Sequence, residues 1–155
     1  MPSALLSDAP KISGLDGKQK MSKSRGTAIM LGATADETAA LVKKATTDGE
    51  RKITYEPERR PEVANLLVIA SLCTGEAPAA IAERIGDGGG GALKRVVTDA
   101  INARLAPVRA RRSELAKDAQ AVVKSVLARG NEAANRVAEV TLREMRAAMK
   151  MDYGL

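Results

Sequence analysis

The segment from Pro61 to Gly75 constrains the fold of this chain more than any other. Its apolar residues fall on most faces of a helix, and they are Val63, Leu66, Leu67, Ile69, Ala70, Leu72 and Cys73. Proline is favoured in the first turn of a helix, which places the start at Pro61. A helix that is apolar on most sides has to be covered by other elements. The sequence therefore predicts a central, buried helix over residues 61–75.

The side chains available to cover this helix are almost all aliphatic. Aromatic residues make up 1% of the 155 residues, namely Tyr55 and Tyr153. A core of Leu, Val, Ile, Ala and Met favours closely packed helices over a β-sandwich, and the length suffices for one domain with a sizeable core. We therefore expect a mainly α fold, a helical bundle of five or six helices with few strands.

The single cysteine and the hydropathy exclude two classes of protein. Cys73 has no second cysteine to pair with, which excludes an intrachain disulfide framework and fits a reducing compartment. Its apolar neighbours favour a buried core thiol over a reactive one. No apolar stretch reaches the length of a membrane span, and the first residues lack the apolar region of a signal peptide. We expect a cytoplasmic protein with no membrane partner.

Local signals predict further helices on both sides of the central one. Thr34 and Glu37 form a capping-box pattern, so a helix should begin there and end before a turn at residues 47–49. Further helices are expected over residues 78–85, from Ala92 onward at helical apolar spacing, and over residues 118–128 and 132–149. The core candidates of the last two segments are Val122, Val126, Val137, Val140, Thr141 and Met145.

Proline and glycine predict where these helices are interrupted. Pro107 removes one backbone hydrogen bond, so a kink or break is expected there. Gly130 and Asn131 indicate a break between the last two segments. The glycine-rich run at residues 86–91 follows a helix and lacks the ending of a phosphate-binding loop, so we expect a flexible hinge or loop. Residues 1–12 and 153–155 should be irregular, and residues 28–31 are a candidate short extended segment.

The positive charge of the chain is concentrated in its last third. The formal net charge is +6, and residues 101–155 carry 11 basic and 6 acidic groups. A basic helical third favours a polyanion partner such as RNA, and ordinary solubility charge explains it equally well. Arg109, Arg111 and Arg112 are candidates for RNA contact by charge alone. The basic residues are not interleaved with aromatics, so base stacking on them is not expected.

The segment Lys20-Met21-Ser22-Lys23-Ser24 carries the chemistry that is easiest to interpret. Lys18 and Arg25 flank it, and no acidic residue falls between Lys18 and Gly26. Lysine ammonium groups are mobile charges with three donors each, and serine hydroxyls add short donors. Such a loop can hold a polyphosphate while charge moves onto its leaving oxygens. The alternative is a solvated basic loop with no ligand.

In its order, the five-residue segment resembles the signature loop of class I aminoacyl-tRNA synthetases. The surrounding residues are similar to the tryptophanyl-tRNA synthetase family at residues 14–17, 47–49, 53–55, 60–67 and 134–138. The resemblance extends from about residue 4 to residue 149 but covers only the C-terminal portion of that family. Class I enzymes also need a nucleotide-binding half with a His-Ile-Gly-His type signature. This chain contains no histidine, so we expect a fragment or the product of a truncated gene.

The resemblance implies ATP-dependent activation of tryptophan followed by transfer to its tRNA. Lys20 and Lys23 would contact the leaving phosphates, with Lys23 the stronger candidate. Met21, Ser22 and Ser24 would shape the loop and bind ATP. Mg²⁺ would share the phosphate charge, although the sequence contains no metal-ligand cluster. The resemblance also implies a homodimer for the complete enzyme.

The same resemblance implies a division of the chain. Residues 1–31 would end the catalytic domain, and residues 32–155 would form the helical tRNA-binding domain. This portion alone should be inactive, because the tryptophan pocket lies elsewhere. Three other interpretations stay open: a non-catalytic helical RNA-binding fragment, a structural helical protein, and the tyrosine-specific relative, which shares this type of loop.

Overall fold

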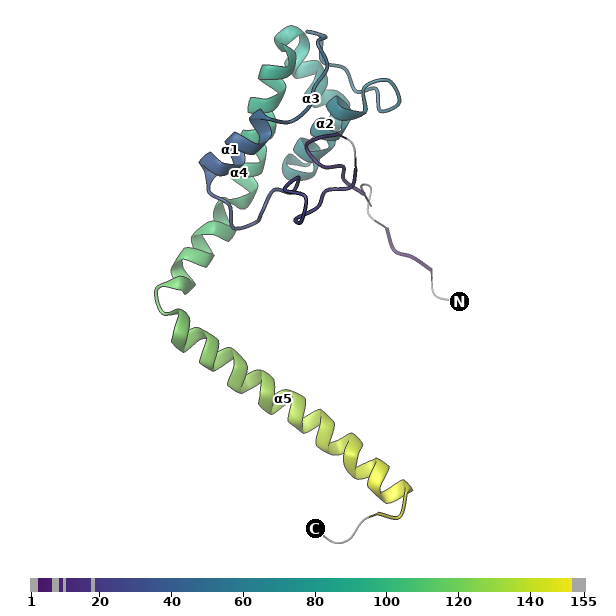
Figure 1. The fold of residues 1–155 in the computed structure, drawn as a ribbon, viewed down its shortest axis with the longest axis vertical. Coiled ribbons are helices and arrows are strands. Elements are labelled where there is room, and N and C mark those ends of the chain that lie inside the picture. Colours follow the sequence, from purple (N-terminus) through teal and green to yellow (C-terminus); the bar gives the residue numbers. More distant parts are fainter. Residues whose placement is uncertain (1–2, 7–8, 10, 18, 152–155) are drawn as a thin grey trace. The chain divides into compact units, whose positions relative to one another are not determined.

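The computed structural model describes residues 3–6, 9, 11–17 and 19–151, which form two compact units, 1–111 and 112–155. Some of the residues named in the sequence predictions lie outside this described part, namely Pro2, Pro10, Lys18 and residues 153–155. The described residues contain five α-helices, one 3₁₀ helix and no strand beyond an isolated bridge between Ser13 and Lys20. The helices are α1 (Ala35–Lys43), α2 (Pro61–Thr74), α3 (Pro78–Ile85), η1 (Gly86–Gly88), α4 (Gly89–Ala116) and α5 (Ala119–Ala148) (Figure 1). The mainly helical fold is therefore confirmed.

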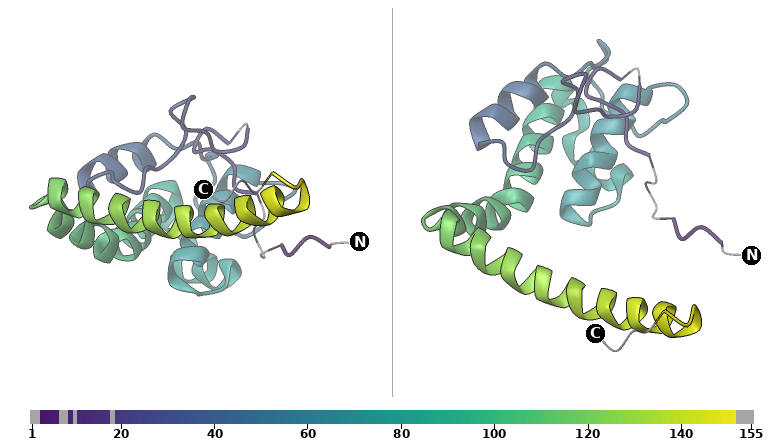
Figure 2. Two further views of the ribbon diagram at one scale, coloured as in Figure 1. Left: turned by 90° about the horizontal axis from the view of Figure 1, so that it is seen from below. Right: turned by 60° about the horizontal axis from the view of Figure 1, so that its bottom comes forward.

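Helix α2 is the centre of the first unit, as the sequence predicts. It buries Val63, Ala64, Leu66, Leu67, Ile69 and Ala70, and it ends at Gly75, whose φ of 80° is left-handed. Val42 of α1, Ile81 of α3 and Leu93 of α4 complete the same core. Helices α1 and α2 flank the N-terminal part of α4 (Figures 1 and 2). This aliphatic core supports the irregular residues 11–17, 19–33 and 44–60.

The start of α1 is the predicted capping box. The backbone N–H of Glu37 donates to Thr34 Oγ1 at 3.1 Å, and the backbone N–H of Thr34 donates to Glu37 Oε2 at 2.7 Å. Two of the donors that a helix start leaves without partners are satisfied in this way. The helix ends at Lys43, before the predicted turn.

The connection between α1 and α2 is held by a buried arginine at its end. Arg60 is 2% exposed, and its Nη1 donates to the Lys52 carbonyl at 2.7 Å and to Thr54 Oγ1 at 2.9 Å. A buried guanidinium needs its donors satisfied, and these loop oxygens supply two of the partners. The loop is therefore shaped around one charged side chain.

The glycine run is not the flexible hinge that the sequence predicts. Residues 86–91 form η1 and the first turn of α4. The Gly89 N–H donates to the Arg51 carbonyl, and the Gly86 carbonyl accepts from the Ile53 N–H, both at 2.8 Å. A Cβ on Gly90 would lie 2.9 Å from Thr47 Oγ1. Part of the glycine run is thus packed against the loop at residues 47–53, and at Gly90 this close approach leaves no room for a side chain.

Pro107 does not break the helix, because α4 is helical from Gly89 to Ala116, so of the predicted kink or break the break is wrong. The turn after the proline is attached to neighbouring residues by Arg109. Its Nη1 donates to Asn102 Oδ1 at 2.8 Å, and its Nη2 donates to Thr38 Oγ1 of α1 at 2.9 Å. These bonds tie the turn after the proline to an earlier turn of α4 and to α1. Arg109 therefore has a structural role in this unit.

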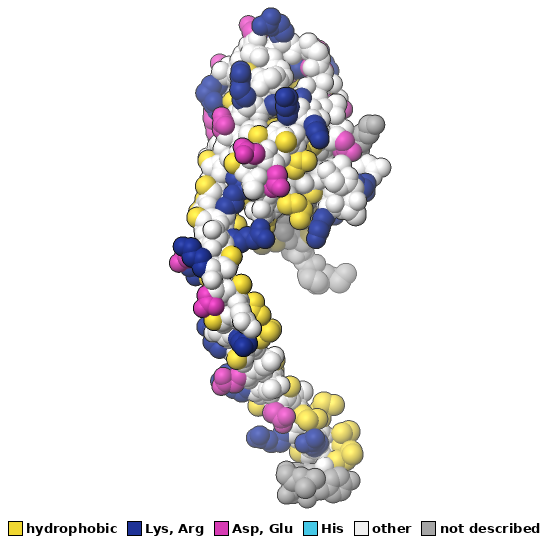
Figure 3. Space-filling view, turned by 60° about the vertical axis from the view of Figure 1, so that its left-hand side comes forward, with side chains coloured by type: hydrophobic (Ala, Val, Ile, Leu, Met, Phe, Trp, Pro, Cys, Tyr) yellow, Lys and Arg dark blue, Asp and Glu magenta, His cyan; other side chains and the backbone are white. Residues whose placement is uncertain are grey.

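The second unit is dominated by α5, which continues through Gly130 and Asn131 without the predicted break. Asp118 caps its start, with Oδ1 accepting from the Ala121 N–H at 3.4 Å. A single glycine costs a helix about 1 kcal/mol, too little to interrupt one this long. The predicted core positions are not buried: Val122 is half-buried, and Val126, Val137, Val140, Thr141 and Met145 are exposed. Figure 3 shows hydrophobic side chains at the surface of this segment.

Among the described residues, no single helix is both long enough and apolar enough to be a candidate membrane span. One pair of helices, residues 61–74 and 78–116 with a bend of 109° between them, reaches the required length and apolar composition when the two are taken together.

Candidate functional site

The predicted site segment forms the second arm of a short hairpin. Ser13 and Lys20 lie opposite each other in an antiparallel bridge. The Gly14 N–H donates to the Gln19 carbonyl at 2.7 Å, and the Met21 N–H donates to the Ile12 carbonyl at 3.1 Å. Two bonds on either side of one residue pair set the register of the arms. The position of Lys20 therefore depends on that of Ser13.

The tip of the loop is closed by its own side chains and a left-handed glycine. The Ser22 N–H donates to Thr27 Oγ1 at 3.1 Å, and the Thr27 N–H donates to the Ser22 carbonyl at 3.2 Å. Lys23 and Gly26 are joined by a turn, with the Gly26 N–H donating to the Lys23 carbonyl at 3.1 Å and Gly26 at a φ of 66°. A φ in this region favours glycine. The tip thus has a defined backbone, with Lys23 at the start of its turn.

The described residues that connect the two arms are anchored in the core of the first unit. Leu15 is 7% exposed and belongs to the hydrophobic core. Its carbonyl accepts from the Thr46 N–H at 2.9 Å. Gly17 adopts a φ of 70° against Glu62 of α2, where a Cβ would lie 2.3 Å from Glu62 Cγ. The loop therefore stands on α2 and on the end of α1.

Of the five predicted site residues, four present polar groups at the surface and one packs inward. Lys20, Lys23 and Ser24 are exposed, Ser22 is half-exposed, and Ser22 Oγ lies 3.0 Å from Ser24 Oγ. Met21 is half-buried and packs against the hydrophobic core. Its side chain anchors the loop, which leaves the lysines and serines to meet a ligand.

The two lysine side chains of the loop, Lys20 and Lys23, make no ion pair within the described residues. Arg25 turns back along the loop, its Nη2 donating to the Lys20 carbonyl at 2.5 Å. Two free ammonium groups beside two hydroxyls form a surface that suits a polyphosphate.

The loop does not supply a metal site of its own. The described residues contain no group of three or more His, Cys, Asp or Glu side chains able to hold a metal ion. Magnesium usually keeps several waters and is often held by substrate phosphates. The residues present therefore do not fit a protein-held Mg²⁺, and the ion would have to arrive with the nucleotide.

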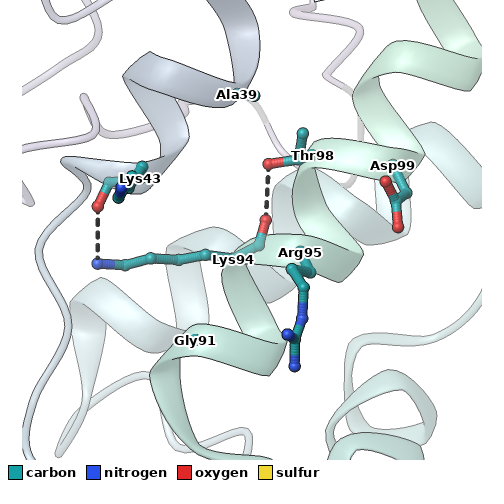
Figure 4. Close-up of a pocket in the computed structure, with 7 residues that line it drawn as sticks. All are labelled: Ala39, Lys43, Gly91, Lys94, Arg95, Thr98 and Asp99. Atoms are coloured by element: carbon teal, nitrogen blue, oxygen red, sulfur yellow. Dashed lines mark hydrogen bonds between the residues drawn. The ribbon is translucent and has the colours of Figure 1, made fainter. Parts of the chain in front are cut away.

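A second basic feature, which the sequence analysis missed, lies between α1 and the start of α4 (Figure 4). A groove of about 370 Å³ is lined by Ala39, Lys43, Gly91, Lys94, Arg95, Thr98 and Asp99. The Lys94 ammonium donates to the Lys43 carbonyl at 3.1 Å, near the C-terminal end of α1. Lysine is favourable beside the partial negative charge of a helix end, so part of this basic surface stabilises α1.

Two other predicted residues have structural roles. Arg109, a candidate for RNA contact, is engaged by Asn102 and Thr38. Cys73 is half-buried against the core, and this burial raises the pKa of its thiol. A raised thiol pKa lowers the fraction of reactive thiolate, which agrees with a packing role.

Comparison with known proteins shows which family shares this sequence. Residues 2–106 match the family described as "tRNA synthetases class I (W and Y)". The tryptophan--tRNA ligase of Thermosynechococcus vestitus is 35% identical over 136 residues, covering 86% of this chain and 41% of that protein. The tryptophan--tRNA ligase of Parasynechococcus marenigrum is 34% identical over 151 residues, covering 96% of this chain and 44% of that protein.

A solved structure shares the fold. The crystal structure of tryptophanyl-tRNA synthetase from Mycoplasma pneumoniae matches with a TM-score of 0.64 at 23% identity, covering 93% of this chain and 44% of that one. This chain therefore spans less than half the length of the relatives that it matches.

Proposed function

This chain belongs to the class I tRNA synthetases of the tryptophan and tyrosine group, and we propose that it is the C-terminal part of a tryptophan--tRNA ligase. The observation that carries the proposal is the loop at residues 12–27. It presents Lys20 and Lys23 without ion-pair partners in the described part, on a backbone anchored in the core. The tyrosine-specific alternative is less favoured, since the relatives named above are tryptophan enzymes.

In the proposed reaction the carboxylate of tryptophan attacks the α-phosphate of ATP, and pyrophosphate leaves. The Lys20 and Lys23 ammonium groups would neutralise the charge that grows on the leaving phosphates, and the Ser22 and Ser24 hydroxyls would donate to them. Phosphoryl chemistry of this kind depends mainly on positioning and on charge stabilisation. Met21 would act through its packing, by holding the arm that carries both lysines.

We further propose a division of labour along the chain. Residues 1–31 would complete the ATP site of the catalytic domain, and residues 32–155 would bind tRNA. Within residues 1–111 the loop and helices α1 to α4 share one core, so this division concerns function and not packing. The basic last third would meet the tRNA phosphates, and the complete enzyme would be a cytoplasmic homodimer.

The decisive experiment joins this chain to the catalytic half of a relative. Residues 1–155 would be fused to the N-terminal portion of the Thermosynechococcus vestitus ligase that the match does not cover. Tryptophan-dependent pyrophosphate exchange is expected from the fusion and not from residues 1–155 alone. A fusion that folds and binds tRNA but never forms adenylate would support the RNA-binding alternative instead.

The role of the loop is tested within the same fusion. Lys23→Ala should slow adenylate formation about 10²–10³-fold, because preorganised donors of this kind stabilise the charge of the transition state. The affinity for tryptophan should hardly change. Lys44→Ala, an exposed lysine beyond the end of α1, is the matched control and should behave like the unmodified fusion. A decrease of less than about threefold, measured by rapid quench, would exclude Lys23 from catalysis.

A further inference from the structure

The backbone N–H and C=O of Ser13 have no hydrogen-bond partner within the hairpin. The bonds beside the Ser13–Lys20 pair come from Gly14 and Met21, so Ser13 and Lys20 form a pair without bonds of its own. In such a pair the N–H and C=O of each residue point away from the partner arm. Ser13 therefore requires a donor and an acceptor on its outer side.

Asn65 of α2 supplies both groups. Its Oδ1 accepts from the Ser13 N–H at 3.1 Å, and its Nδ2 donates to the Ser13 carbonyl at 3.1 Å. A side-chain amide is suited to this because it carries one acceptor and two donors on the same plane. The two residues are 52 positions apart in sequence, so the contact ties the loop to a distant element.

Helix α2 holds the backbone of Asn65 in a fixed position. Its neighbours Ala64 and Leu66 are 4% and 1% exposed, and both sit in the most buried helix of the first unit. Close-packed side chains leave little freedom for the backbone that carries them. The position of Asn65 is thus determined by the core, and Asn65 in turn determines that of Ser13.

We propose that Asn65 is the positioning residue for Lys20 in the ATP-binding loop. It acts through Ser13, which lies opposite Lys20, and it touches no substrate itself. The anchors at Leu15 and Gly17 lie on the connection between the two arms, and Met21 packs beside the pair, whereas Asn65 is the side chain that bonds to the outer backbone edge of Ser13 itself. The catalytic part of this inference rests on the proposed function, whereas the positioning part does not.

The positioning part is tested on the 155-residue chain by amide hydrogen exchange. Asn65→Ala removes both bonds, and Asn65→Asp keeps the acceptor but loses the donor. The amides of Gly14 and Met21, which do not bond to Asn65, should exchange about tenfold or more faster in Asn65→Ala. The amides of Leu66 to Ala70 within α2 should be unchanged. Thr74→Val is the control, because it removes two bonds at the end of the same helix, from the Thr74 hydroxyl to the Ala70 carbonyl and from the Glu76 N–H to that hydroxyl. It should leave the loop amides protected.

Two exchange results would overturn the positioning role. One is unchanged exchange of Gly14 and Met21 in Asn65→Ala. The other is a uniform acceleration that includes α2, which would mean that Asn65 stabilises the whole unit. If Asn65→Ala does not fold, Asn65→Asp answers the same question, and its loop amides should exchange faster than those of the Thr74→Val control.

The catalytic part is tested by a double-mutant cycle in the fusion. Asn65→Ala should slow adenylate formation about 10–100-fold, the effect of a misplacement of roughly 1 Å. In a Lys20→Ala background it should add less than threefold, because the group that it positions is gone. Equal losses in both backgrounds would overturn the assignment to Lys20. An inactive unmodified fusion would instead reject the proposed function. It would not affect the hydrogen-exchange test of the positioning role.

Discussion

Arg60 and Asp48 form a two-bond ion pair that closes the connection between α1 and α2. The Arg60 Nε and Nη2 atoms donate to Asp48 Oδ2 and Oδ1, each at 2.6 Å. Only 2% of the Arg60 side chain is exposed, against 33% of the Asp48 side chain. A planar guanidinium matches a carboxylate in this side-by-side geometry, which a lysine cannot reproduce. The pair gives the connection between α1 and α2 a defined shape.

Arg60→Lys should therefore destabilise the protein despite conserving the charge. The variant removes the bonds that Arg60 makes to Asp48, to the Lys52 carbonyl and to Thr54 Oγ1, and one ammonium cannot replace them all. We expect a loss of about 2–3 kcal/mol in the free energy of unfolding. Arg59→Lys is the control, since Arg59 makes exposed pairs with Glu50 and Glu56. Its urea midpoint should match that of the unmodified protein. Equal midpoints for the two variants would refute the prediction.

The same pair predicts how stability depends on pH. The hydrogen bond from Arg60, aided by the Glu50 N–H, holds the pKa of the Asp48 carboxyl below its ordinary value. The carboxylate therefore contributes stability that is complete above the unfolded-state pKa of about 4 and is lost as the pH falls through the lower folded-state pKa. Urea titrations at several pH values between about 7 and 2.5 should show this acid loss. Asp48→Asn should be less stable at neutral pH and should show a shallower acid loss.

Sequence signals that act within a few residues predict the helix starts and bounds of this fold well. They do not predict contacts between residues that are distant in sequence. The Thr34–Glu37 cap, the start of α2 at Pro61 and the bounds of α3 depend on neighbours in sequence. The Asn65–Ser13 bonds join residues 52 apart, and no local pattern marks them.

The errors have a related cause. Val126 and Val137 have the spacing of core residues, yet spacing does not say whether another element covers a helix. The sequence predicts a flexible glycine run because it does not reveal a close neighbour from a distant segment, such as Thr47 beside Gly90. The order of residues 20–24 indicates the candidate site, whereas the anchors that support the loop are contacts between residues far apart in sequence.

Two left-handed glycines of the loop should respond differently to alanine. Gly17 and Gly26 have φ values of 70° and 66°, so a Cβ is strained at both, by about 1–2 kcal/mol. At Gly26 nothing lies within 4 Å of the added carbon, but at Gly17 it would lie 2.3 Å from Glu62 Cγ. Gly17→Ala should therefore lower the thermal midpoint more than Gly26→Ala. Adding Glu62→Ala to Gly17→Ala should bring the loss down to that of Gly26→Ala, and failure to do so would contradict the steric explanation.

The first turn of α4 offers a test in the opposite direction, where alanine should stabilise the protein. Gly91 is helical with nothing within 4 Å of an added Cβ, so Gly91→Ala should raise the free energy of unfolding by about 0.5–1 kcal/mol. At Gly90 the added carbon would lie 2.9 Å from Thr47 Oγ1, and the displacement of this side chain should cancel the gain. Thr47→Ala removes that atom, so Gly90→Ala should become stabilising when it is introduced into the Thr47→Ala protein. Urea denaturation of the four variants measures these changes in the free energy of unfolding. A flexible glycine hinge would give the same small effect at Gly90 and Gly91, whereas a packed helical turn gives different effects at the two positions.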